Sequence, residues 1–122
     1  MAWPSGLPVI RVRLARPTDR LDEVVSFYRD GLGLQELGRF EAHSGYDGVL
    51  LGLPGSDYHL EFTAHADGSP CPAPSVDNLL VLYLESEQAA EIVSGRLADM
   101  GYSDVEPENP YWLWRSVTVE DP

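Results

Sequence analysis

The sequence predicts an α+β protein built from two weakly similar modules, each with the order strand, helix and further strands. Two observations lead to this fold class. Both predicted helices end on similar letters, LGL at Leu32–Leu34 and MGY at Met100–Tyr102, which gives an internal offset of 68 residues. The same offset places Leu14 on Leu82 and Arg11 on Leu79, strand on strand. A repeat of this kind describes the chain better than one irregular domain.

The chain of 122 residues is long enough for one domain with its own core, and its apolar fraction of 43% is typical of globular proteins. Within this domain the first module is expected at residues 9–63. A Pro-, Gly-, Ser- and Asp-rich linker follows at residues 64–78, and the second module occupies residues 79–122.

The first module begins with a strand at Val9–Ala15, where apolar and basic residues alternate, and Pro17 ends it. Thr18 or Asp19 is expected to cap the next helix. Gly31 and Gly33 end that helix. Its predicted apolar face consists of Leu21, Val24, Val25, Tyr28 and Leu32.

Three strand-like runs complete the first module, at Leu34–Glu41, Gly48–Pro54 and Tyr58–Thr63. The segments between them are rich in Gly, Ser, Asp and Pro, which is the chemistry of turns. The first module therefore reads β-α-β-β-β.

The second module begins with Leu79–Leu84, which we expect to be a buried strand. Ser86 can cap a helix that Gly101 ends. The apolar stripe of this helix consists of Ala89, Ile92, Val93, Leu97 and Met100. The runs YSDVEPE and WRSVTVE offer two more strands, so this module is one strand shorter than the first.

The formal charge of −12 argues against nucleic acid and against anionic membrane surfaces, because both require a basic face on the protein. The same charge is compatible with a cationic small ligand. The sequence contains no run of about 20 apolar residues and no secretory leader, so we expect a soluble, cytoplasmic protein. Cys71 is the one cysteine, so it has no partner for an internal disulfide.

The stretch YHLEFTAH, Tyr58–His65, raises the question of a metal site. Strand alternation places His59, Glu61, Thr63 and His65 on one face and the apolar residues on the other. Residues two apart along a strand are nearly 7 Å apart, which is long for ligands of one ion. The stretch is therefore either an improvised metal site from His59, Glu61 and His65 or, as we favour, the wall of a pocket.

The order of these elements, with FYRDGLGL at Phe27–Leu34 and EDP at Glu120–Pro122, resembles the glyoxalase/bleomycin-resistance/dioxygenase superfamily, also called the vicinal oxygen chelate proteins. The resemblance implies that two βαβββ modules form a half-open curved sheet around a cavity, with the last strand of the second module missing here. It also implies a homodimer. Enzymes of this superfamily hold a divalent metal with one ligand from the first and one from the last strand of each module.

The metal positions that the resemblance implies are poorly filled in this chain. Arg11 stands at the first, Glu61 at the second and Leu79 at the third, while the fourth falls beyond Pro122. A guanidinium has no lone pair to give, and a leucine cannot ligate. Glu61 is the only family-like ligand retained, so we expect no metal cofactor. We expect instead an ion pair between Arg11 and Glu61, which Arg13 could join.

The aromatic run YWLW, Tyr111–Trp114, is a second candidate for ligand contact. By strand alternation Trp112 and Trp114 would share a face, and Tyr46 borders the corresponding region of the first module. Aromatic walls bind flat or cationic ligands by stacking and cation–π contact. The alternative is that these rings only fill the core.

The sequence therefore favours a metal-free protein that binds a small aromatic or cationic molecule. The alternative is a metal-dependent lyase, isomerase or dioxygenase of the superfamily, or a metal-free enzyme with His59 or Glu61 as base. Whether the protein is an enzyme stays open at this point. The candidate ligand-binding residues are Arg11, Arg13, Tyr46, His59, Glu61, Trp112 and Trp114.

Overall fold

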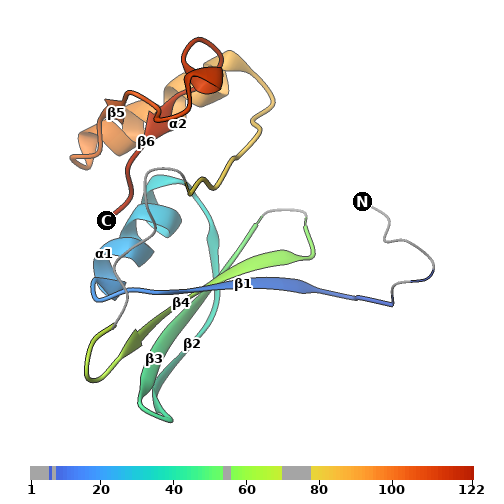
Figure 1. The fold of residues 1–122 in the computed structure, drawn as a ribbon, viewed down its shortest axis with the longest axis vertical. Helices are drawn as coiled ribbons and strands as arrows, with labels where there is room; N and C mark the ends of the chain where they lie inside the picture. Colours follow the sequence, from blue (N-terminus) through green and yellow to red (C-terminus); the bar gives the residue numbers. More distant parts are fainter. Residues whose placement is uncertain (1–5, 7, 54–55, 70–77) are drawn as a thin grey trace. The chain divides into compact units, whose positions relative to one another are not determined.

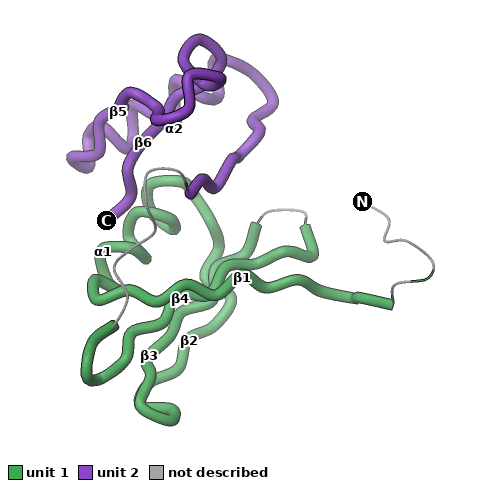
Figure 2. The backbone as a smooth tube through the Cα atoms, in the orientation of Figure 1, with its two compact units in different colours: residues 1–71 green, residues 72–122 purple. Residues whose placement is uncertain are grey.

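The computed structural model describes residue 6 and residues 8–53, 56–69 and 78–122. The chain divides into two compact units, residues 1–71 and residues 72–122 (Figure 2). Cys71 and most of the predicted linker lie outside the described residues. Among the described residues, no helix is long and apolar enough to cross a membrane.

The first unit contains a four-stranded sheet with one helical segment (Figure 1). Its strands lie in the order β1-β4-β3-β2, with β1 parallel to β4 and the other pairs antiparallel. The predicted order β-α-β-β-β is confirmed. The elements are β1 Val12–Pro17, α1 Leu21–Val25, the π-helix η1 Ser26–Gly31, β2 Gln35–His43, β3 Tyr46–Gly52 and β4 Tyr58–His65.

The core of this unit lies between the helical segment and one face of the sheet. Val49 and Leu51 of β3 are almost completely buried, as are Leu60 and Phe62 of β4. The ring of Tyr28 stacks on that of Phe62, with centroids 4.9 Å apart. The predicted helical face is confirmed at Val24, Val25 and Tyr28, and Phe27, which the prediction omitted, is buried as well.

The start of the first helix differs from the prediction. Arg20 occupies the N-cap position and makes no side-chain capping bond. Thr18 accepts a hydrogen bond from the backbone N–H of Arg20, and the Asp19 carboxylate accepts one from Ser69. Both predicted capping side chains are therefore bonded outside the helix. The predicted end is confirmed, because Gly31 closes η1 and Gly33 adopts a positive φ of 93°.

The second unit is built around helix α2, Glu87–Asp99, and the predicted cap is confirmed. The Ser86 hydroxyl accepts a hydrogen bond from the backbone N–H of Ala89 at 3.0 Å. Gly101 follows the helix with a φ of 98°. The two predicted strands contract to β5, Asp104–Val105, and β6, Thr118–Val119, which pair with each other.

Two predictions for the second unit are wrong. Leu79–Leu84 forms no strand, and its side chains are exposed, from 37% at Leu82 to 86% at Tyr83. A buried strand needs hydrogen-bonded neighbours on both edges, and among the described residues β5 and β6 pair only with each other. The YWLW run is not a strand either, because Pro110–Trp112 forms the 3₁₀ helix η2.

A glycine of β3 provides a direct test of this packing. A Cβ placed at Gly48 would overlap the Phe40 ring, whereas a Cβ at Gly38 would meet only Leu50 Cδ1, at 3.8 Å. We expect Gly48→Ala to lower the free energy of unfolding by ~1–3 kcal/mol, the usual cost of overpacking. Gly38→Ala should change it by less than about 0.5 kcal/mol. Chemical denaturation of both variants checks this, and equal stabilities would show that the Phe40 ring moves aside at no cost.

Candidate functional site

The site is formed by the face of the first unit's sheet that lies opposite the core. His59 and Glu61 alternate along β4 with the core residues Leu60 and Phe62, as the sequence predicted. The neighbouring strands place Arg13 opposite His59, and Leu50 opposite Glu61. We call this surface the cup face; its side chains include Arg11, Arg13, Gln35, Leu50, His59 and Glu61.

A cavity of about 610 Å³ opens on the cup face. Its donors and its apolar groups come from all four strands of the sheet and from the turn before β4. This volume is in the usual range for small-molecule sites. The lining residues are Arg11, Arg13, Gln35, Leu37, Leu50, Gly52, Leu53, Ser56, Asp57, Tyr58 and His59.

Arg13 joins the two β4 residues that the sequence singled out. Its Nε donates a hydrogen bond to His59 Nε2 at 2.9 Å, and its Nη1 donates to Glu61 Oε2 at 3.0 Å. An arginine nitrogen can only donate, so His59 Nε2 must carry a lone pair and the proton of the neutral ring lies on Nδ1. The Glu61 side chain is 16% exposed and that of Arg13 is 47% exposed, so water reaches this ion pair from the guanidinium side.

The surroundings of His59 favour its neutral form. Its side chain is buried, and burial is the largest cause that lowers its pKa. The positive charges of Arg13 and Arg11 lower the pKa further, while Glu61 acts in the opposite direction. The neutral ring is also the form that accepts the bond from Arg13.

The predicted ion pair between Arg11 and Glu61 is wrong, because the cation that pairs with Glu61 is Arg13. The parallel register places Arg13 opposite His59, where its guanidinium reaches both β4 side chains. Arg11 precedes the first residue of β1 and lines the cavity. Within the described residues it makes no ion pair or hydrogen bond through its side chain.

The other predicted contact residues lie elsewhere. The Tyr46 ring packs edge-on against His65, with centroids 4.7 Å apart, and does not line the cavity. In the second unit the Trp112 ring meets Tyr111 edge-on at 4.9 Å. Trp114 is 95% exposed. The predicted shared face of Trp112 and Trp114 is wrong, because the helical turn of η2 replaces the alternation of a strand.

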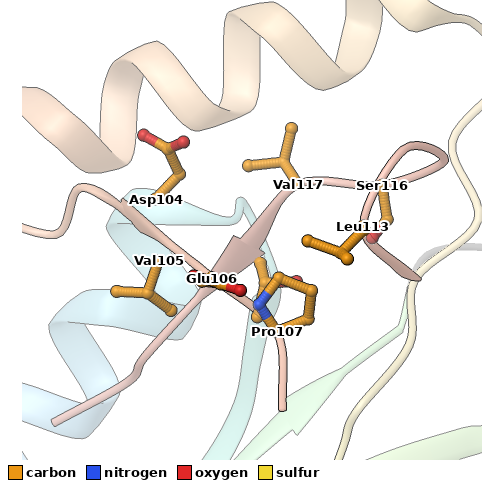
Figure 3. A pocket seen from close by; sticks show the side chains of 8 residues that line it. Asp104, Val105, Glu106, Pro107, Leu113, Ser116 and Val117 are labelled. Atoms are coloured by element: carbon orange, nitrogen blue, oxygen red, sulfur yellow. The ribbon is translucent and has the colours of Figure 1, made fainter. Parts of the chain in front are cut away.

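The second unit contains a cavity of its own, of about 450 Å³ (Figure 3). It combines two carboxylates with apolar side chains and contains no arginine or histidine. We therefore place the candidate site on the cup face. The lining residues of this second cavity are Asp104, Val105, Glu106, Pro107, Leu113, Ser116, Val117 and Thr118.

Several cavity residues were absent from the sequence prediction. Leu50 could have been predicted from the sequence, because Leu50 shares a face with Gly48 and Gly52 in a strand that the sequence did predict. Gln35 and Leu37 alternate in the same way along β2, but alternation alone does not tell which face of that strand meets the cavity, and the pairing of Gln35 with Gly52 decides it.

Comparisons with known proteins agree along the whole chain. The family model of the YycE-like N-terminal domain matches residues 12–63, and that of the YycE-like C-terminal domain matches residues 77–122. The uncharacterized protein YycE of Bacillus subtilis (strain 168) is 48% identical over 118 residues, which is 97% of this chain and 85% of that protein.

Solved structures show the same relationship. The crystal structure of a YycE protein of unknown function from Bacillus subtilis, a candidate glyoxalase/fosfomycin resistance protein, superposes with a TM-score of 0.89 at 48% identity. That match covers 97% of this chain and 86% of the other.

Two further structures share the fold at lower identity. TnmS3, an antibiotic binding protein from Streptomyces sp. CB03234, has a TM-score of 0.66 at 19% identity, over 95% of this chain and 90% of its own. The trypanothione-dependent glyoxalase I of Leishmania major also has a TM-score of 0.66, at 18% identity, over 90% of this chain and 77% of its own. The chain belongs to the YycE-like family, and its fold places it in the glyoxalase/bleomycin-resistance/dioxygenase superfamily.

Proposed function

We propose that this protein binds a small organic molecule in the cavity of the cup face and does so without a metal ion. The observation that carries the proposal is the composition of that cavity. Hydrogen-bond donors from Arg11, Arg13 and His59 stand beside apolar side chains, Leu50 among them. Sites for small molecules combine an apolar lining with a few polar groups that fix the ligand's orientation.

The donor set of the cup face does not fit the divalent cation that superfamily enzymes use. A metal ligand must offer a lone pair, and ligands must converge on one point. The Nε2 lone pair of His59 accepts a bond from Arg13, and the Glu61 carboxylate pairs with the same guanidinium. Among the described residues, no group of three or more His, Cys, Asp and Glu is placed to hold a metal.

The same bonds argue against His59 as a general base. A base needs a free lone pair within reach of the substrate proton. The Nε2 lone pair of His59 is engaged by Arg13, and the other ring nitrogen carries the proton. These bonds favour binding over catalysis. TnmS3, which shares the fold, is itself an antibiotic binding protein, and this gives the proposal a precedent.

The homodimer that the sequence analysis expected stays a prediction.

A ligand screen by thermal unfolding tests the proposed function. A ligand at about 100 times its Kd adds ~2.7 kcal/mol to the stability of the native state, which raises Tm by several degrees. Leu50→Trp, which fills the cavity, should abolish the shift. Leu14→Trp is the matched control, because Leu14 is an exposed β1 residue that does not line the cavity.

Metal analysis of the purified protein provides the second part of this test. We expect less than stoichiometric zinc, nickel, manganese and iron, and an unchanged Tm after treatment with a chelator. One metal ion per chain whose removal lowers Tm would contradict the metal-free proposal. Ligand shifts that persist in Leu50→Trp would place the binding outside the cup face.

The lowered pKa of His59 predicts a pH dependence of stability. Between its folded pKa and the unfolded value of about 6.5, the unfolded chain binds more protons than the folded chain. The stabilisation is therefore complete above about pH 6.5 and is lost as pH falls through the folded pKa. His59→Gln keeps an acceptor for Arg13 without titrating. Urea denaturation should show a steeper loss between about pH 7.5 and pH 5 in the wild type than in this variant.

If the free energy of unfolding changes equally with pH in the wild type and in His59→Gln, His59 is already solvated and protonates normally in the folded state. The carboxylates of the chain titrate in both proteins, so the difference between the slopes isolates the contribution of His59.

A further inference from the structure

We propose that the cup-face cavity binds an oxyanion, such as a carboxylate, carried by an otherwise apolar small molecule, and that Arg11 is the principal cation for it. This inference rests on the proposed function and adds the chemical class of the ligand. An anionic ligand group takes the place of the cationic ligand that the net charge of −12 suggested.

The lining of the cavity contains more hydrogen-bond donors than its own acceptors engage. Arg13 uses Nε and Nη1 for His59 and Glu61, which leaves its Nη2 group. His59 has its proton on Nδ1, because Nε2 is the acceptor. Arg11 adds a guanidinium that no acceptor of the described residues engages. Donor groups of this kind are satisfied by an acceptor with several lone pairs, and an oxyanion is one.

Two positive charges belong to the lining of the cavity. Arg11 and Arg13 are two residues apart on the cup face, about 7 Å along the chain, and both positive charges act on His59. Glu61 compensates Arg13. Asp57 also lines the cavity, but no ion pair joins it to either arginine. An anionic ligand group that contacts Arg11 would therefore meet a guanidinium that no described carboxylate engages, whereas the Asp57 carboxylate would repel it and would attract a cationic group instead.

The rest of the lining includes apolar side chains. Leu37, Leu50 and Leu53 provide apolar surface, and Gly52 contributes no side chain. An ion such as free phosphate would leave this surface in contact with water. An aryl or alkyl group attached to the oxyanion would cover it, and each buried methylene contributes favourably to binding.

Isothermal titration with one matched series of probes tests the inference. The series is 4-phenylbutyrate, its neutral amide, the amine 4-phenylbutylamine, and inorganic phosphate. We expect the wild type to bind the acid and to bind the amide and the amine at least about tenfold more weakly, since a charge-assisted bond contributes that much. Phosphate alone should bind more weakly than the acid because it covers no apolar surface.

Arg11 variants assign the effect to one residue. Arg11→Gln should weaken binding of the acid by about tenfold, and Arg11→Lys, which keeps the charge but loses the planar fork, by less. Arg39→Gln is the matched control, because Arg39 pairs with Glu36 and does not line the cavity. Arg11 and Arg39 are both exposed, and a surface ion pair such as Arg39–Glu36 contributes little, so we expect all three variants to melt close to the wild type.

The outcomes separate this inference from the proposed function. Equal binding of acid, amide and amine, unaffected by Arg11→Gln but abolished by Leu50→Trp, would overturn the oxyanion site and leave the binding function intact. Tighter binding of phosphate than of the acid would overturn the apolar part of the ligand. Absence of binding for the whole series, together with no stabilising compound in the thermal screen, would overturn both proposals.

Discussion

The position of β4 between two neighbouring strands is the constraint on which the rest of the first unit depends. Its backbone is paired with β1 on one edge and β3 on the other, so its side chains can point only to the two faces of the sheet. Leu60 and Phe62 complete the core, and His59 and Glu61 belong to the cup face. A register slip of one residue would exchange the two sets and place a carboxylate in the core. The core and the site are therefore fixed together.

Arg13 determines the chemistry of that face. One guanidinium takes up the lone pair of His59 and the negative charge of Glu61, so the two residues that most resembled metal ligands are already bonded. Burial, and after it the charges of Arg13 and Arg11, favour the neutral form of His59, and the bond from Arg13 places its proton on Nδ1. The lining of the cavity still offers donors to a ligand, and one of them, the Arg11 guanidinium, makes no ion pair with a described residue.

The sequence was most informative where a short-range pattern determines the structure. The strands of the first unit follow from alternation and turn residues, and Ser86 and Gly101 mark the two ends of α2. It was least informative in the second unit. An apolar run such as Leu79–Leu84 fits a buried strand equally well whether or not a partner strand exists, and YWLW does not reveal that Pro110 starts a helical turn.

By itself the sequence determined the order of the elements in the first unit and the face of β4 that carries His59 and Glu61. The tertiary structure decided which arginine reaches those two residues. Arg11 and Arg13 share a face of the first strand segment, so periodicity cannot distinguish them. The parallel register of β1 and β4 does, because it aligns Arg13 with His59. Register depends on contacts between distant segments, which no local pattern encodes.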